Sequence, residues 1–234
     1  MRLVKFLAHA GVASRRASEE IIRDGRVSIG GQICVDPARG VDGKSRVTVD
    51  GKRVELPDTR VVYAVNKPVG VISTASDPQG RTTVVELIPD AGRLFPVGRL
   101  DVGSSGLILL TNDGELANLL THPKFEVPKV YRVRVGGGPI GATELRLLSE
   151  GVQLEDGITL PARVSKLGSR ILEIELREGR NRQIRRMCEA VGHPVAALER
   201  IAIGPQRLGR LTEGGYRRLN TPEVDALRDA ASRE

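Results

Sequence analysis

Apolar positions in the first quarter of the chain change from helical to strand spacing. Residues 3–10 repeat at helical intervals, and Ser14 stands where it can cap a second helix expected at about 15–24. Two β-favouring runs then surround Gly30-Gly31, and the same pattern returns around Asp50-Gly51. The pattern predicts a small α/β unit of two helices followed by two hairpins.

A polar connector that contains proline follows, and we place it at residues 57–61. We therefore expect a first domain at 1–56 and a larger domain at 62–234. Strand spacing over 61–74 predicts two strands about a turn at Asn66-Lys67-Pro68.

The rest of the larger domain mixes helical and strand patterns. The alternation at 129–135 puts Tyr131 on the same face as two valines. The other expected elements are a short helix or strand at 82–88, a helix at 114–122 opened by Asn112 or Asp113, a helix at 142–151, a strand at 170–179, a helix starting near Asn181, and a last helix at 221–234 with Thr221 as its cap and Pro222 at its first position. The pattern favours an α+β domain.

Charge adds a partner class to this picture. Lys and Arg number 36 against 29 Asp and Glu, a formal net charge of +7 among 234 residues. Residues 1–56 alone hold eleven Lys or Arg and seven Asp or Glu. Such an excess favours a polyanionic partner, with nucleic acid as the leading candidate.

Several kinds of site are disfavoured by the spacing of the residues they need. The two cysteines, Cys34 and Cys188, are far apart and the three histidines are isolated, so neither a disulfide framework nor a metal site is expected. No phosphate-binding loop or hydrolase nucleophile elbow is complete. The first residues lack a signal-peptide pattern and no apolar run reaches membrane length, so a cytoplasmic protein without membrane association is expected.

Two stretches carry candidate chemistry. In VGRLDVGSSGL, Asp101 stands between an arginine and a turn rich in glycine and serine, and by itself it is either a turn residue or a reactive acid. REGRNRQIRRM places five arginines in ten positions beside one acid, which favours phosphate or carboxylate as a partner. The alternative for this second stretch is a basic surface helix without a site.

The stretch VGRLDVGSSGLILLTNDGELANLLTHP strongly resembles the catalytic motif of one bacterial family. These are the pseudouridine synthases of the ribosomal small-subunit synthase A group, which includes the large-subunit synthases B, E and F; the B type is the most similar. YAVNKPVGVIST, KVYRVRV and EGRNRQIRRMCEAVGHPV resemble the family's other motifs, in the family's order. The first segment resembles an S4 RNA-binding domain. The resemblance implies a pseudouridine synthase fold, a largely antiparallel mixed sheet flanked by helices.

The resemblance also implies roles for individual residues. Asp101 matches the family's catalytic aspartate, Tyr131 its tyrosine, and Arg185 the arginine expected to pair with the acid, with Arg180 as second choice. The target base is expected to be flipped out of the RNA. Arg99 is expected to fill the gap that this base leaves or to contact the RNA backbone, and Lys67 to support the active loop. Ser104 replaces the family's usual threonine and keeps its hydroxyl. The residues expected to bind RNA are Arg2, Lys5, Arg15, Arg16, Arg26, Arg182 and Arg186.

The implied reaction breaks the bond from ribose C1′ to uracil N1 and joins C1′ to C5, so it needs no cofactor and no metal. Asp101 would act at the ribose as nucleophile or as base, and the sequence leaves both open. The expected substrate is ribosomal RNA, with 23S rRNA preferred and 16S rRNA or tRNA as alternatives. The protein is expected to be a monomer that binds ribosomal RNA or ribosome assembly intermediates. The competing hypothesis is an RNA-binding assembly factor that does not need catalysis.

Overall fold

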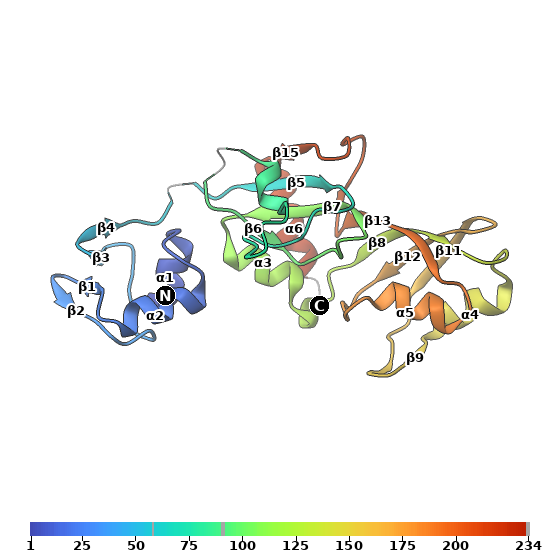
Figure 1. Ribbon diagram of the computed structural model, residues 1–234, viewed down its shortest axis with the longest axis horizontal. Coiled ribbons are helices and arrows are strands. Elements are labelled where there is room, and N and C mark those ends of the chain that lie inside the picture. The colour runs from blue at the N-terminus through green and yellow to red at the C-terminus, as the bar shows by residue number, and fades with distance from the viewer. Residues whose placement is uncertain (58, 90–91, 233–234) are drawn as a thin grey trace. The chain divides into compact units, whose positions relative to one another are not determined.

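The computed structural model describes residues 1–57, 59–89 and 92–232. The chain forms two compact units, Met1–Arg60 with Asn112–Gly114, and Val61–Thr111 with Glu115–Glu234 (Figure 1). The connector expected at 57–61 includes position 58, which lies outside the described residues. We did not expect three residues from the middle of the sequence, Asn112–Gly114, to belong to the first unit.

The first unit consists of two helices and a four-stranded sheet. Helix α1 is Leu3–His9 and α2 is Arg15–Arg23, and the Ser14 hydroxyl accepts a hydrogen bond from the Ala17 amide at 3.2 Å, which confirms the expected cap. Both hairpins are confirmed, with positive φ at Gly30, Gly31, Asp50 and Gly51 as such tight turns require. The strands are β1 (Val27–Ile29), β2 (Gln32–Ile33), β3 (Val47–Val49) and β4 (Lys52–Val54), in the order β2-β1-β3-β4.

A nine-stranded sheet is the framework of the second unit. Its main path is β11-β12-β8-β13-β7-β5-β15, with β14 beside β13 and β6 beside β7. The β13–β7 pair is parallel and the other pairs are antiparallel, which confirms the mixed, largely antiparallel sheet. The strands are β5 (Val62–Lys67), β6 (Phe95–Val97), β7 (Ser105–Thr111), β8 (Lys129–Val135), β11 (Arg163–Gly168), β12 (Ile171–Leu176), β13 (Val195–Ile203), β14 (Gln206–Arg207) and β15 (Tyr216–Arg218).

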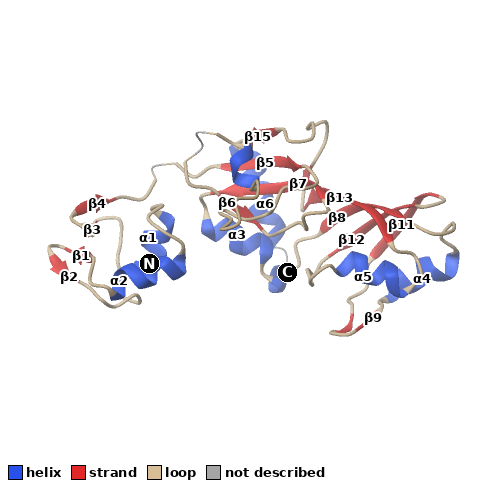
Figure 2. Ribbon diagram, in the orientation of Figure 1, coloured by secondary structure: helices blue, strands red, loops and turns tan. Residues whose placement is uncertain are grey.

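Helices pack along both halves of this sheet. Figure 2 shows α3 (Gly114–Thr121) and α6 (Thr221–Ser232) beside β5 and β7, α5 (Gln183–Ala190) beside β12, and α4 (Ala142–Glu150) beside β11. Separate apolar cores lie under these two pairs of helices. The second unit also contains the 3-10 turns η1 (Val84–Leu87) and η2 (Pro123–Phe125) and the small hairpin β9 (Gln153–Leu154) and β10 (Gly157–Ile158).

The turn expected at Asn66-Lys67-Pro68 is wrong. Strand β5 runs through Asn66 and Lys67, which lie opposite Leu107 and Gly106 of β7. Pro68, which has no N–H to donate, follows the last paired residue. No return strand follows among the described residues; Ile72 forms only a single bridge with Thr83. The long-range partner β7 decides where β5 ends, so local turn residues mislead here.

The starts of the last two helices also differ from the expectation. Helix α5 begins at Gln183, because Arg182 before it has a left-handed backbone with φ of 49°. Helix α6 is capped by Asn220 rather than Thr221: its side-chain oxygen accepts from the Glu223 amide at 3.0 Å, and the Glu223 carboxylate accepts from the Asn220 amide at 2.9 Å. The last two positions of the expected helix, 233 and 234, lie outside the described residues.

Strands β7 and β13 approach closely where Gly106 lies opposite Arg200. Gly106 has φ of +102°, and a Cβ there would lie 2.3 Å from the Arg200 carbonyl oxygen. Only glycine fits this backbone and this spacing. The contact holds the segment before β7, which contains Asp101, against the middle of the sheet.

Candidate active site

A cavity of about 340 Å³ lies in the second unit where the two halves of its sheet meet. Its lining joins the segment before β7, strand β8, the arginine-rich segment before α5, and strand β13. The main polar residues that line it are Arg99, Asp101, Ser104, Lys129, Tyr131, Glu178, Arg180, Arg182 and Arg200. The motifs that carry the candidate chemistry, which are far apart in sequence, thus share one cavity.

Asp101 is both a turn residue and an acid facing cations. Its carbonyl oxygen accepts a hydrogen bond from the Ser104 amide at 3.0 Å, which closes the turn before β7. Its carboxylate Oδ2 lies 3.7 Å from Arg185 Nε and 3.7 Å from Arg182 Nη1, and the side chain is 31% exposed. The turn therefore presents the Asp101 carboxylate to two guanidinium groups.

Arg185 holds the Asp101 turn from the side of α5. Its Nη2 donates to the Gly103 carbonyl oxygen at 2.8 Å and to the Ser104 hydroxyl at 3.1 Å. Its buried Nε has no hydrogen-bond partner among the described residues and faces the Asp101 carboxylate. The Ser104 hydroxyl, kept where the family usually has threonine, is therefore used in this contact. The pairing of Arg185 with Asp101 agrees with the arrangement expected from the sequence.

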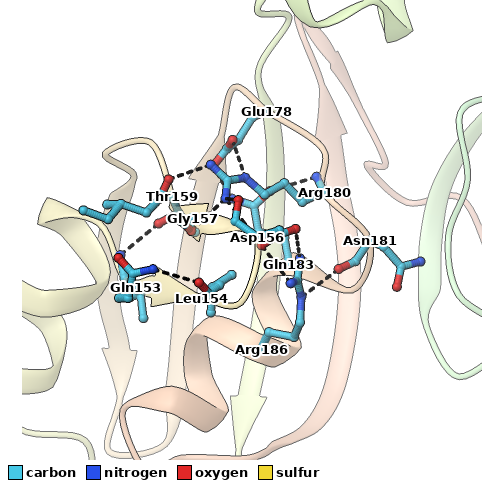
Figure 3. A network of polar contacts seen from close by, with 12 residues as sticks. Gln153, Leu154, Asp156, Gly157, Thr159, Glu178, Arg180, Asn181, Gln183 and Arg186 are labelled. Atoms are coloured by element: carbon cyan, nitrogen blue, oxygen red, sulfur yellow. Dashed lines mark hydrogen bonds and ion pairs between the residues drawn. The ribbon is translucent and has the colours of Figure 1, made fainter.

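Arg180 has other partners, which corrects its second-choice assignment to Asp101. Its Nε lies 3.0 Å from the Glu178 carboxylate, and its Nη groups donate to the carbonyl oxygens of Gly157 at 2.8 Å and Ile158 at 2.6 Å (Figure 3). Arg180 therefore ties the β9–β10 hairpin to the segment before α5. Arg180 lines the cavity, but its contacts hold the cavity wall together and do not reach Asp101.

Arg186 is also held by an acid. Its two Nη groups lie 2.9 and 3.0 Å from the two carboxylate oxygens of Asp156, also drawn in Figure 3. The bidentate pair lowers the pKa of Asp156 and raises that of Arg186. Arg186 was expected to bind RNA, and this assignment stays a prediction; Arg182, its companion in that prediction, lies beside Asp101 instead.

Tyr131 lies half-buried on β8, with Ile174 of β12 on one side and Arg200 of β13 on the other. Its ring packs against the apolar cores of both halves of the sheet and lines the cavity. The side chain is thus a core residue and a cavity residue at once. An aromatic wall in this position offers a flat surface to a bound base.

Lys67 supports the Asp101 segment through the loop that follows strand β5. Its side chain is fully buried, and its Nζ donates to the carbonyl oxygens of Pro68 and Val71, each at 2.8 Å. The Gly70 amide donates to the Val102 carbonyl oxygen at 2.8 Å, so the loop that Lys67 holds is joined to the Asp101 turn. Burial lowers the pKa of Lys67 to about 8, which the nearby Asp101 charge opposes.

Two basic residues of the cavity were missed by sequence reasoning. Arg200 on β13 is only 3% exposed, and Lys129 at the start of β8 is partly buried. Arg200 shares the phase of the buried residues Leu198 and Ala202, so strict alternation along 195–203 was the signal that could have found it. An arginine on the inward face of a strand is unusual enough to indicate a site.

The residues expected to bind RNA in the first unit differ in their surroundings. Arg15 and Arg16 are exposed in the first turn of α2, and Arg2 is exposed just before α1. Lys5 is partly buried on α1. Arg26 forms a bidentate pair with Asp50, at 2.9 and 2.5 Å, which raises its pKa. Arg26 is therefore the candidate whose guanidinium is already occupied.

Comparison with known families decides the identity of this site. Residues 61–190 match the family model described as RNA pseudouridylate synthase. The chain belongs to this RNA pseudouridylate synthase family. Residues 1–47 match the S4 domain model. As a pseudouridine synthase the protein is an isomerase, and the resemblance read from its motifs is confirmed at the level of this family and its S4 domain.

Individual relatives cover almost the whole chain. It is 43% identical over 237 residues to the ribosomal large subunit pseudouridine synthase B of Bacillus subtilis, covering 98% of this chain and 96% of the relative. The Yersinia pestis protein of the same name is 40% identical over 240 residues, 97% of this chain and 75% of the relative. A crystal structure of a pseudouridylate synthase matches with a TM-score of 0.72 and 31% identity, over 97% of this chain and 99% of that one.

Metal-binding clusters and membrane-spanning helices are both absent from the described residues. No group of three or more His, Cys, Asp or Glu side chains is arranged to hold a metal ion in the part of the chain that the structure describes. Within that same part, no helix is long and apolar enough to span a membrane.

Proposed function

We propose that this protein converts one uridine of large-subunit ribosomal RNA to pseudouridine. The similarity over nearly full length to proteins named large subunit pseudouridine synthase B supports this substrate. Because the small-subunit synthase A group includes the B type, the same similarity favours that group within the family. The domain division that goes with this function is an S4 domain at 1–56, a connector at 57–61 and the catalytic domain at 62–234.

The observation that carries the proposal is the Asp101 carboxylate, held between Arg185 and Arg182 in a cavity walled by Tyr131. The reaction breaks the C1′–N1 bond with both electrons leaving on the base, turns the base, and forms C1′–C5. The C5 proton is then lost and N1 gains one, so the product is an isomer. Asp101 acts on the ribose as nucleophile or base, and in either role it must be ionised.

A uridine inside folded RNA reaches this cavity only after leaving its stack, which costs a few kcal/mol. Tyr131 recovers part of this free energy by stacking on the extruded base, and its hydroxyl serves proton transfer at C5. Arg99 is exposed next to the cavity and suits the space that the base leaves in the RNA, or the backbone beside it. Lys67 keeps the Asp101 loop in place.

The first unit supplies placement on the RNA. Exposed Arg2, Arg15 and Arg16 are suited to phosphate contacts with a neighbouring RNA helix, joined by Lys5 and Arg26. Arg182, exposed at the cavity, contacts the RNA as well, and Arg186 joins it although Asp156 already occupies its guanidinium. We propose that the protein acts in the cytoplasm as a monomer on ribosomal RNA or on ribosome assembly intermediates.

A single-turnover assay on in vitro transcribed 23S rRNA tests this function, with wild type and Asp101→Asn compared. We expect one pseudouridine from wild type and none from the variant, with RNA binding equal in both. Product on 16S rRNA or tRNA instead of 23S would change the substrate. No product on any of these RNAs, with binding retained, would favour the assembly-factor hypothesis.

A further inference from the structure

Arg200 braces both ends of the segment that contains Asp101. Its Nε donates to the Leu107 carbonyl oxygen at 2.7 Å and its Nη1 to the Arg99 carbonyl oxygen at 3.4 Å. Leu107 follows Asp101 by six residues and Arg99 precedes it by two. The guanidinium thus holds the turn from inside the sheet, on a strand whose backbone is fixed against Gly106.

The third nitrogen of Arg200 is not used by the protein. Nη2 is buried and has no hydrogen-bond partner among the residues that the structure describes. Arg200 itself is 3% exposed and lines the cavity. A buried charged donor without a partner is costly, and such groups in native proteins require an explanation such as a ligand that completes them.

Lys129 adds a second positive charge near Arg200. Lys129 lines the same cavity, with its Nζ donating to the Val127 carbonyl oxygen at 2.9 Å. Glu178, an acid of the same lining, is occupied by Arg180, Gln183 and the Leu160 amide. The unused donor therefore points to a ligand group that carries or gains negative charge.

We propose that Arg200 Nη2 donates a hydrogen bond to a carbonyl oxygen of the extruded uracil and stabilises the charge that the base gains. The inference rests on the proposed function. When C1′–N1 breaks, the electron pair spreads from N1 onto the carbonyl oxygens, whichever role Asp101 takes. A charged donor that the protein has fixed beforehand favours that state over the neutral base.

A base is a better partner for Arg200 than a phosphate group because Arg200 is buried. Arg200 is almost fully buried, whereas the side chain of Arg182 is 55% exposed and Arg99 is exposed, so these two are accessible to the RNA backbone. A base turned into the cavity reaches further than the backbone that carries it. Arg200 is thus a base-binding residue that also positions the Asp101 turn.

A double-mutant cycle between enzyme and RNA tests this contact. Single-turnover rates are measured for wild type and Arg200→Met on a short target RNA with uridine, 2-thiouridine or 4-thiouridine at the modified position. Sulfur is a weaker acceptor than oxygen. We expect Arg200→Met to lower the rate about 10- to 100-fold with uridine, and the thio effect at one carbonyl to shrink at least about fivefold in the variant.

The controls separate the possible failures. Arg207→Met removes an exposed arginine outside the cavity and should keep the wild-type rate and thio effect. If Arg200→Met does not fold, Arg200→Lys takes its place in the double-mutant cycle. Equal thio effects in wild type and both variants would overturn the contact. Coupling with a methylphosphonate 5′ to the target instead would assign Arg200 to phosphate and also overturn it. No turnover of unmodified RNA by wild type would instead contradict the proposed function.

Discussion

At the scale of single residues, the site depends on how each arginine is occupied. Arg180 and Arg186 are held by Glu178 and Asp156, so their charge is used within the protein. Arg185 is 16% exposed and reaches the Asp101 turn through three contacts, while Arg182 is 55% exposed and reaches only the carboxylate. Burial and geometry therefore rank residues that look alike in the sequence.

This ranking predicts different losses at the two arginines that face Asp101. Arg185→Gln should lower the single-turnover rate by about 100-fold or more, because a preorganised partly buried charge and the turn are both lost. Arg182→Gln should lower it by less than about 10-fold, because an exposed pair at 3.7 Å is screened by water. Quenched-flow rates at saturating enzyme compare the two. Equal losses would show that the order assigned to them is incorrect.

Lys129 gives a prediction for stability against pH. Burial lowers its pKa in the folded protein to about 8 from an ordinary 10.5. Below both values the lysine is charged in both states and its burial destabilises the fold; between them the folded state releases its proton first. The free energy of unfolding of wild type should therefore rise relative to Lys129→Met, by about 1–2 kcal/mol from pH 8 to 10.5. Urea titrations at several pH values measure this, and a constant difference between the proteins would contradict it.

At the scale of elements, the parallel contact between β7 and β13 joins the two halves of the catalytic sheet. The register puts Gly106 beside Arg200, and Tyr131 of β8 lies on the other side of Arg200. The acid, the aromatic ring and the buried guanidinium are therefore placed by one junction. This junction makes Gly106, the second glycine of the GSSG stretch, a structural requirement of the site.

Gly106→Ala should lower the free energy of unfolding by about 2–4 kcal/mol, because the new methyl group meets the β13 backbone and the residue keeps a positive φ. Gly138→Ala is the matched control, since a Cβ there meets nothing within 4 Å. Denaturant unfolding of both variants checks the difference. Equal stability of Gly106→Ala and Gly138→Ala would disprove the close approach of the strands.

Local pattern predicted most of these elements but not their junctions. The Ser14 cap and the hairpins of the first unit and the strand that contains Tyr131 follow from short-range spacing. The end of β5 and the inward position of Arg200 depend on pairing with β7, more than 35 residues from the former and about 90 from the latter. The partner of Asp101 came from family resemblance, and the separation of Arg185 from Arg180 required the positions of Glu178 and Gly157.

At the scale of the whole molecule, the proposed function assigns RNA binding to the first unit and the chemistry to the second. The residues around the cavity belong to the second unit, while exposed Arg15 and Arg16 are on the first. Phosphate contacts give a protein affinity that falls with salt, about one unit of slope for each contact. RNA binding and catalysis should therefore respond to different substitutions.

The double variant Arg15→Gln/Arg16→Gln should weaken RNA binding and reduce the slope of log affinity against log salt by about 1–2. Its single-turnover rate at saturating RNA should stay as in wild type. Arg26→Gln should change the slope less, because Asp50 already occupies that guanidinium. Filter binding from low to high salt gives these slopes. A slope that stays at the wild-type value in the double variant would remove these arginines from the RNA contact.

We propose that Asp101 in this cavity makes one pseudouridine in 23S rRNA. Pseudouridine mapping of ribosomal RNA tests it most directly, in cells that lack the protein and carry either the wild-type gene or Asp101→Asn. We expect one site in 23S rRNA that is missing without the protein, returns with wild type, and stays missing with Asp101→Asn at equal protein level. An unchanged map, or a site restored by Asp101→Asn, would contradict it.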